Sequence, residues 1–206
     1  MFKNVIFDWS GVICDDTYAS YQADMDLFRE CGVAPITFEE FKQEWEMPFM
    51  NFLHKYIPNI TFVKQHKIFK KAIVKYNQNK LYPGAQDILK KLSDNQINLF
   101  IVSSDLGIII DTLNLFNLKD LFTEVVYKVH DKTESVKNLI QKYNLDPDQT
   151  IFIGDTNHEI ETSQKLGIKS GAVTWGYCLE EKLKALNPDF LIKNFTELEQ
   201  IILKIN

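Results

Sequence analysis

The chain has 206 residues, of which 45% are hydrophobic and 25% charged, and its formal net charge is −5. This length suits one sizeable core, or a main domain with a smaller insertion. Acidic and basic residues are mixed along the chain without the basic block that nucleic acids or anionic membranes attract, so we expect neither as a partner.

The three cysteines stand far apart, at Cys14, Cys31 and Cys178, and form no C-x-x-C pair. This number and spacing argue against a disulfide framework and against a thiolate zinc site. We see no segment with the composition of a signal peptide, and no apolar run approaches the roughly 20 residues that span a bilayer. We therefore expect a cytoplasmic location.

The first predicted element is a short apolar run, Val5-Ile6-Phe7, which ends at Asp8. Its β-branched and aromatic content is typical of a strand buried on both faces. In open α/β sheets, ligands bind beyond the carboxyl ends of the strands, so Asp8 is a candidate site residue. Taken alone, it could also be a simple turn or capping residue.

Helical spacing replaces the strand pattern from about residue 16 to about residue 79. In the first part, large apolar side chains recur every three to four residues, at Tyr18, Tyr21, Met25 and Phe28. The stretch from Phe62 to Tyr76 shows similar spacing. Both segments are therefore predicted to be amphipathic helices.

A third helix is predicted between these two. Thr37 and Glu40 have the spacing of a capping box, which begins a helix, and Met47-Pro48 breaks it. Residues 45 to 55 are expected to form loops. The three helices predict a small all-helical cap, residues 15–80, inserted into a core made of residues 1–14 and 81–206.

After Tyr82-Pro83-Gly84 the chain alternates between helix and strand patterns. We predict helices at 84–94, 105–116, 133–143 and 157–166, strands at 97–102, 123–127, 150–153 and 171–174, and a last strand and helix near 190 to 204. Strands separated by helices of this length form a mostly parallel sheet with helices on both faces. The predicted fold class is therefore α/β, with a doubly wound parallel sheet.

Polar residues follow four of the predicted strands. In chain order they are Asp8 with Ser10, Ser103-Ser104-Asp105, His130-Asp131-Lys132, and Asp155 with Glu159. Each group alone could be a helix cap or a solvated surface group. Together they place a carboxylate, a hydroxyl, a lysine and an acidic pair on one edge of a parallel sheet, which favours a single site.

In these four motifs and their order, the chain resembles the haloacid dehalogenase-like superfamily of aspartate-nucleophile hydrolases over essentially its whole length. The resemblance implies a Rossmann-like core with a helical cap. It also implies that Asp8 is the nucleophile, Ser103 the hydroxyl that holds the phosphoryl group, Lys132 the cation beside both, and Asp155 with Glu159 the magnesium-binding end.

Phosphoryl transfer needs residues of these types. An anionic carboxylate can attack a phosphoryl group only when fixed donors and cations cancel the negative charge. Lys132, the hydroxyls of Ser103 and Ser104, and backbone N–H groups at the start of helix 105–116 could do so. Attack by Asp8 would give an aspartyl-phosphate and split hydrolysis into two steps.

The expected cofactor is Mg²⁺, which prefers oxygen ligands and usually keeps several waters. We expect Asp8, Asp155 and the main-chain carbonyl of Ser10 as direct ligands. Glu159 is expected to act through a bound water.

The sequence departs from the superfamily's common phosphatase pattern at Ser10. Most of these phosphatases carry a second Asp there, which acts as general acid for the leaving group and then as general base for the attacking water. A serine hydroxyl has no pKa near neutrality, and a positioned carboxylate contributes about 10²- to 10⁴-fold in rate. Magnesium binding should survive, because this position contributes a backbone oxygen.

Two alternatives follow from this departure. Asp8-Trp9-Ser10-Gly11 resembles the D-W-A-G-T form of the phosphonoacetaldehyde hydrolase branch, in which a cap lysine forms a Schiff base with the substrate aldehyde. Lys42, Lys55 and Lys64 lie in the predicted cap, although none matches that branch's motif. The second alternative is a catalytically weakened member that binds phosphorylated ligands without turnover.

The preferred interpretation is a magnesium-dependent phosphatase of small phosphorylated metabolites, similar to phosphoglycolate phosphatases. It acts through an aspartyl-phosphate on Asp8, with a small metabolite as its partner and a monomer or weak homodimer as its assembly state. The identity of the substrate depends on cap contacts that a sequence does not specify.

Overall fold

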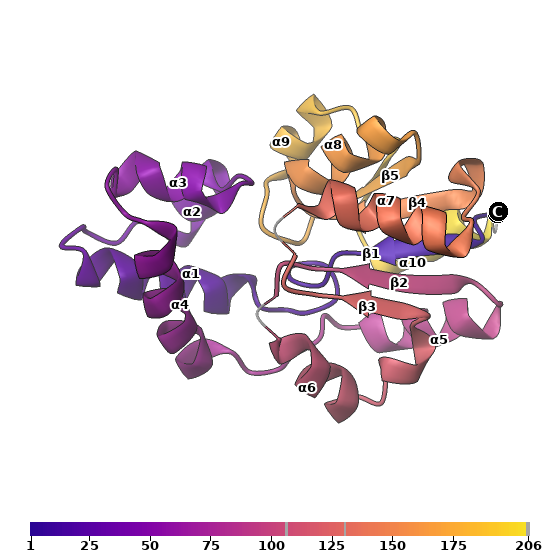
Figure 1. The fold of residues 1–206 in the computed structure, drawn as a ribbon, viewed down its shortest axis with the longest axis horizontal. Helices are drawn as coiled ribbons and strands as arrows, with labels where there is room; N and C mark the ends of the chain where they lie inside the picture. Colours follow the sequence, from indigo (N-terminus) through magenta and orange to yellow (C-terminus); the bar gives the residue numbers. More distant parts are fainter. Residues whose placement is uncertain (106, 130, 205–206) are drawn as a thin grey trace.

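The computed structural model describes residues 1–105, 107–129 and 131–204. Its centre is a six-stranded parallel sheet with the strand order β3-β2-β1-β4-β5-β6 (Figure 1). The strands are β1 (Asn4–Phe7), β2 (Asn98–Val102), β3 (Glu124–Val126), β4 (Thr150–Gly154), β5 (Lys169–Val173) and β6 (Phe190–Ile192). β1 lies between β2 and β4, where the order of the strands reverses, and this is the place where such sheets bind ligands.

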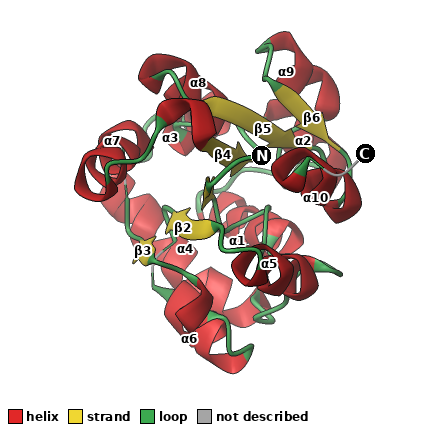
Figure 2. Cartoon of the chain, turned by 90° about the vertical axis from the view of Figure 1, so that its right-hand side faces the viewer, coloured by secondary structure: helices red, strands yellow, loops and turns green. Residues whose placement is uncertain are grey.

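The side chains of β1 alternate between two covered faces. Val5 and Phe7 join the cluster that includes α5 (Ala85–Asp94), α6 (Ile108–Leu115) and α10 (Phe195–Leu203). Ile6 joins the opposite cluster, which is covered mainly by α7 (Lys132–Tyr143). On that same side, α8 (Asn157–Leu166) and α9 (Glu180–Ala185) cover β5. Figure 2 shows the sheet between these two layers, which confirms the doubly wound α/β prediction.

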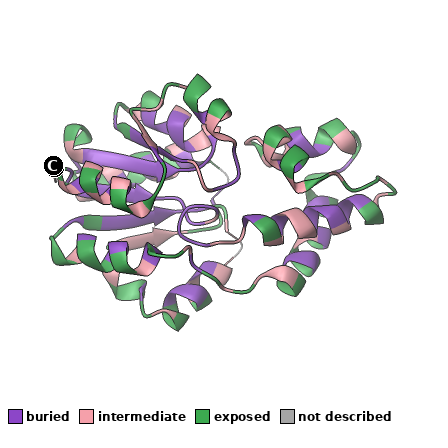
Figure 3. Cartoon of the chain, turned by 180° about the vertical axis from the view of Figure 1, so that it is seen from behind, coloured by how far each residue is buried: buried purple, intermediate pink, exposed green. Residues whose placement is uncertain are grey.

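Four helices follow β1 and lie beyond the carboxyl ends of the strands, at the left of Figure 1. They are α1 (Thr17–Glu30), α2 (Phe38–Glu44), α3 (Phe49–Tyr56) and α4 (Phe62–Tyr76). They have an apolar cluster of their own, rich in aromatic side chains, and α1 packs along α4. Figure 3 shows buried segments on these helices where they face one another and the sheet. We refer to α1–α4 as the cap helices.

Three helices differ from the prediction: α3 was expected to be a loop, α9 was not expected, and α6 begins later than expected. Residues 49–56 form helix α3 and not a loop; Phe49, Phe52, Leu53 and Tyr56 have helical spacing, but the segment is short. Helix α9 was not predicted, and its six residues bury only Leu183. Such short helices depend on tertiary packing rather than on their own propensity.

Helix α6 begins at Ile108, three residues later than predicted. The Asp105 side chain accepts hydrogen bonds from the backbone N–H groups of Gly107 (2.7 Å) and Ile109 (3.0 Å), and Gly107 has a φ of +114°. This local turn delays the helix. Leu106, in the predicted helix 105–116, and His130, in the motif His130-Asp131-Lys132, lie outside the described residues.

Shorter features agree with the sequence. Thr37 caps α2 by accepting a hydrogen bond from the N–H of Glu40, and the break at Met47-Pro48 separates α2 from α3. Two 3₁₀ helices, Lys119–Leu121 and Pro147–Gln149, complete the described elements. All three cysteines are free thiols. Within the described residues, every helix is too short or too polar to cross a membrane.

Candidate active site

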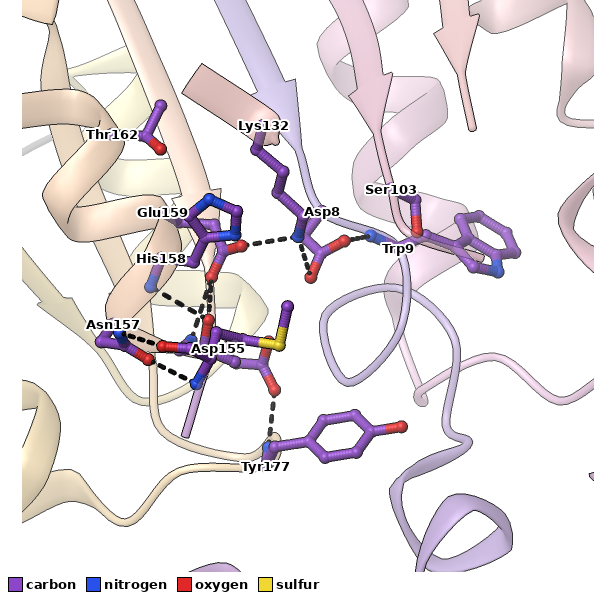
Figure 4. A network of polar contacts seen from close by, with 12 residues as sticks. Asp8, Trp9, Ser103, Lys132, Asp155, Asn157, His158, Glu159, Thr162 and Tyr177 are labelled. Carbon is purple, nitrogen blue, oxygen red and sulfur yellow. Dashed lines mark hydrogen bonds and ion pairs between the residues drawn. The ribbon is translucent and has the colours of Figure 1, made fainter. Parts of the chain in front are cut away.

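Three buried side chains from three elements meet at the carboxyl edge of the sheet (Figure 4). Asp8 follows β1, Lys132 is the first residue of α7, and Glu159 lies in the first turn of α8. The Lys132 ammonium lies 2.9 Å from Asp8 Oδ2 and 2.6 Å from Glu159 Oε1. The lysine therefore bridges two carboxylates. The sequence analysis expected Lys132 beside Asp8 but did not expect its contact with Glu159.

The bridging lysine controls the charges of this group. Burial raises the pKa of Asp8 to about 6, against the opposing attraction of Lys132. Burial alone would lower the pKa of Lys132, but the two carboxylates outweigh it and raise the pKa, so the ammonium stays charged. Burial would likewise raise the pKa of Glu159, yet Lys132 holds it below its usual value. A cation thus stands ready beside Asp8 at neutral pH.

Asp155 follows β4 and lies opposite this bridge. Its Oδ2 accepts a hydrogen bond of 2.6 Å from the backbone N–H of Tyr177, while its Oδ1 is buried and has no hydrogen-bond partner among the described residues. Burial, and then the nearby Asp8 carboxylate, raise the pKa of Asp155 well above its usual value. A buried carboxylate oxygen without a partner is costly, and a bound cation would relieve it.

The acidic groups are close enough to share one ion. One carboxylate oxygen each from Asp8, Asp155 and Glu159 lies within 4.8 Å of the others. This all-oxygen set, together with the unpartnered Oδ1 of Asp155, fits the ligand preferences of Mg²⁺.

Two glycines make room for the Asp155 carboxylate. A Cβ atom on Gly11, which has a φ of +74°, or on Gly176 would overlap Asp155 Oδ2. Gly11 follows β1 and Gly176 follows β5. The loops after these two strands can therefore close tightly around the acidic group.

Both carboxylate oxygens of Glu159 are already engaged. Oε1 contacts Lys132, and Oε2 accepts hydrogen bonds from the backbone N–H (3.1 Å) and the hydroxyl (2.7 Å) of Thr156. Thr156 and Glu159 form the capping box of α8. This arrangement agrees better with an indirect role toward a metal than with direct ligation.

The serines after β2 occupy different positions. Ser103 is fully buried, and its Oγ accepts a hydrogen bond of 3.1 Å from the N–H of Asp105. Ser104 lines the cavity beside the site. The N–H groups of Gly107 and Ile109 already bind the Asp105 carboxylate, so these two N–H groups are not free for a phosphate.

Ser10 lies beside Asp16, an acidic residue that the sequence analysis did not assign to the site. The Ser10 side chain hydrogen-bonds to Asp16, and the N–H of Gly11 donates to Asp16 Oδ1 at 3.0 Å. Burial raises the pKa of Asp16 to about 7, against these two hydrogen bonds. Both Ser10 and Asp16 line the cavity. Asp16 just precedes α1 and reads as a helix cap, so its spacing gave no sign of a site role.

A cavity of about 160 Å³ lies between the sheet edge and the cap helices. Its sheet side includes Asp8, Lys132 and Asp155, and its cap side includes Asp24 and Gln65, which the sequence analysis also missed. One signal was available: Asp24 stands three residues after Tyr21, on the apolar face of the predicted helix.

None of the three cap lysines named from the sequence lines this cavity. Lys55 pairs with Glu44 and Glu46 at the surface, and Lys64 is exposed. Lys42 is half-buried, and burial lowers its pKa against the attraction of Asp155.

Comparisons with known proteins agree with the fold and the motifs. Residues 5–173 match a family model described as haloacid dehalogenase-like hydrolase. The pyrophosphatase PpaX of Oceanobacillus iheyensis is 23% identical over 208 residues, which cover 97% of this chain and 96% of that protein. The phosphoglycolate phosphatase of Synechococcus elongatus is 27% identical over 128 residues, which cover 61% of this chain and 60% of that protein.

Solved structures extend the comparison to the whole chain. A haloacid dehalogenase-like family hydrolase from Streptococcus pneumoniae superposes with a TM-score of 0.83 at 20% identity, covering 99% of both chains. A protein from Clostridium acetobutylicum described as a predicted phosphatase gives a TM-score of 0.82 at 19% identity and covers 100% of both. At these identities the structures show a shared fold.

Proposed function

Because the chain belongs to the haloacid dehalogenase-like hydrolases, we propose that it is a magnesium-dependent phosphatase of small phosphorylated metabolites. The observation that carries this proposal is the buried group at the sheet edge, in which Lys132 lies 2.9 Å from Asp8 and the acidic oxygens lie within 4.8 Å of one another. The names of two relatives, pyrophosphatase and phosphoglycolate phosphatase, support hydrolysis of phosphate compounds.

Asp8 is the proposed nucleophile. Its Oδ1 accepts a hydrogen bond of 2.7 Å from the N–H of Trp9, which orients the carboxylate. A carboxylate oxygen attacks phosphorus, the bond to the leaving alcohol breaks, and the alcohol oxygen takes a proton from solvent. Water then attacks the aspartyl-phosphate, which releases inorganic phosphate and restores the carboxylate.

The phosphoryl group needs positive charge and hydrogen-bond donors around it. Lys132 supplies a buried ammonium, and the hydroxyls of Ser103 and Ser104 are the proposed donors at the end of β2. Lys132 also keeps Asp8 ionised, which an attacking carboxylate requires.

Asp8, Asp155 and the main-chain carbonyl of Ser10 are the proposed ligands of Mg²⁺, and Glu159 the group that reaches it through water. Bound there, the ion would neutralise negative charge on the phosphoryl oxygens. The unpartnered Asp155 Oδ1 supports this assignment.

Residues 15–80 are the proposed cap, and residues 1–14 and 81–206 the proposed core. The cap helices form one wall of the cavity, so they can exclude water and contact the leaving group. A cytoplasmic location and a monomer or weak homodimer remain predictions.

Ser10 has a measurable consequence for this function. Because a serine hydroxyl does not donate a proton as a carboxylic acid does, substrates with acidic leaving groups should react much faster than alkyl phosphates. We expect the rate of the first step to fall steeply as the pKa of the leaving group rises.

The direct test is hydrolysis of p-nitrophenyl phosphate, whose leaving group needs little protonation. We expect activity with Mg²⁺ and a loss of about 10⁴-fold or more with EDTA or in Asp8→Asn. Asp26→Asn is the matched control, because Asp26 lies on α1 and pairs with Arg29 and Lys75 at the surface. Equal rates with Mg²⁺, with EDTA and in Asp8→Asn would refute the proposal.

Phosphonate hydrolysis is the second candidate, favoured by the Trp9-Ser10 sequence. Borohydride should trap a lysine adduct of phosphonoacetaldehyde if this activity is present, and mass spectrometry of the trapped protein would identify the lysine. If every phosphate ester and phosphonate binds and none is turned over, the chain is instead a phospholigand-binding member of its family.

A further inference from the structure

One buried acid on the cap side of the cavity has no partner in the part of the chain that the structure describes. Asp24, on α1, is 2% exposed and lines the cavity. Among the described residues, none forms a hydrogen bond or ion pair with its side chain, and burial alone raises its pKa to about 8. A buried carboxyl group without a partner is destabilising unless a proton or a ligand satisfies it.

Asp26, two residues further on, shows what a partnered acid looks like on the same helix. Its carboxylate accepts hydrogen bonds from Arg29 (2.7 Å), Lys75 (3.1 Å) and the Tyr76 hydroxyl (2.8 Å). α1 thus carries one acid that is neutralised at the surface and one that faces the cavity without a counterion.

A second polar side chain faces the cavity beside Asp24. Gln65 lies on α4, which packs along α1; it is 6% exposed, and its side-chain amide has no hydrogen-bond partner among the described residues. Ser20, one turn before Asp24, accepts a hydrogen bond of 2.6 Å from the Tyr177 hydroxyl. We call Asp24 and Gln65 the cap pair.

The positively charged side chains that line the cavity are not evenly distributed between its sheet end and its cap end. Lys132 is the only lysine among the described residues that line it, and it lies at the sheet edge. No described lysine or arginine lines its cap side. A leaving group with its own negative charge would therefore meet no lysine or arginine at this end, whereas an ammonium group would find the Asp24 carboxyl and could favour its ionised form.

Aromatic side chains make up much of the remaining lining, four from the cap helices and their connections and one, Tyr177, from the loop after β5. Trp45, Phe49, Phe62, Phe69 and Tyr177 line the cavity. Aromatic faces attract cations, and aromatic cages are a recognised means of binding ammonium groups. The cavity volume of about 160 Å³ is below the range of drug-sized ligand pockets, so it favours a small leaving group.

We propose that the cap pair binds the leaving group of the substrate, and that this leaving group carries a protonated amine. The substrate class is then the phosphate ester of a small amino alcohol. In the complex the ammonium donates hydrogen bonds to Asp24 and to the side-chain carbonyl of Gln65, with aromatic rings around it. This inference rests on the proposed phosphatase activity and specifies the class of its substrate.

The test compares esters that share one phosphate and differ at the far end of a short chain. Aminoalkyl phosphates of two to four carbons are measured against hydroxyalkyl phosphates of equal length and against phosphoglycolate. In the wild-type protein we expect kcat/KM for the best aminoalkyl ester to exceed that for its hydroxyl analogue by about 10-fold or more, with phosphoglycolate slowest.

Asp24→Asn should lower kcat/KM for the aminoalkyl ester by about 10- to 100-fold and lower it much less for the hydroxyalkyl ester, so that the preference for the amine falls by about 10-fold or more. Asp26→Asn is the matched control and should change neither. A uniform loss on all substrates, no change, or a wild-type preference for phosphoglycolate would overturn the proposal.

A second measurement does not depend on variants. Aminoalkyl phosphonates, which cannot be hydrolysed at the P–C bond by this route, should inhibit p-nitrophenyl phosphate hydrolysis at least about 10-fold more strongly than carboxyalkyl phosphonates of equal length. Equal inhibition would contradict the inference while the phosphatase activity stands. If p-nitrophenyl phosphate itself is not hydrolysed, the proposed function fails first, so the two failures are distinguishable.

Discussion

The sheet edge and the cap wall both bury polar groups against one cavity, but they satisfy them differently. At the sheet edge, Asp8 and Glu159 share the Lys132 ammonium at 2.9 and 2.6 Å. On the cap wall, Asp24 and Gln65 have no described partner. The charged groups at the sheet edge are therefore already paired before a ligand binds. The polar groups of the cap wall need a proton or a ligand to complete their hydrogen bonds.

Removing the lysine should give the largest effect on this comparison. Lys132→Met leaves two buried carboxylates without a counterion, so we expect the free energy of unfolding at pH 7 to fall by about 3 to 5 kcal/mol. Urea denaturation measures this change. Lys142→Met is the control: its ammonium lies 2.7 Å from Glu124 at the surface, and its loss should change stability by less than about 1 kcal/mol. Similar losses in the two variants would contradict the account.

Asp24 on the cap wall should make the free energy of unfolding depend on pH. Asp24 has a pKa of about 8 in the folded protein and near 4 in the unfolded chain. Between these values the unfolded chain binds fewer protons, so this group makes stability fall as pH rises from about 4 to about 8. Other titratable groups line the same cavity, among them His66 from α4 and Asp16 and Lys132 from the sheet side. A comparison of the wild type with a variant changed only at position 24 leaves these groups in place.

Asp24→Asn removes this titration. Its free energy of unfolding should match that of the wild type below about pH 4 and exceed it increasingly up to about pH 8, by on the order of 5 kcal/mol at pH 9. Denaturation across this pH range, without substrate, gives both curves. Parallel curves for wild type and variant would mean that Asp24 has an ordinary pKa and that the cap wall is not an unsatisfied surface.

The metal assignment sharpens the comparison at the sheet edge. Asp155→Asn should raise the Mg²⁺ concentration for half-maximal activity by at least about 100-fold, because it removes a proposed direct ligand. Glu159→Gln should raise this concentration by about 10-fold, because the proposed role of this residue is to reach the ion through water. Titration of p-nitrophenyl phosphate hydrolysis with Mg²⁺ measures both. A larger effect at Glu159 than at Asp155 would exchange their assigned roles.

Much of the sheet edge was predictable because local sequence determines it. Continuous apolar runs identified the strands, and residues that directly follow parallel strands must meet at one edge. Asp8, Lys132, Asp155 and Glu159 came together for this reason, and the structure adds the distances between them.

The cap wall was not predictable in the same way. Asp24 and Gln65 face the cavity because of the way α1 packs along α4. The periodicity of the sequence alone does not predict this packing. Tyr177, whose N–H binds Asp155, comes from the loop after β5 and belongs to no predicted motif. The late start of α6 depends on hydrogen bonds from Gly107 and Ile109 to one side chain, a local competition that overrode the apolar pattern.

The most direct test of the central claim is to trap the covalent intermediate. The protein is mixed with a phosphate ester and Mg²⁺, quenched in acid within milliseconds, and digested for mass spectrometry. The account predicts one phosphorylated peptide, sensitive to hydroxylamine and carrying the group on Asp8, and none in Asp8→Asn. Turnover at full rate with no label on Asp8, or with the label on another residue, would contradict it.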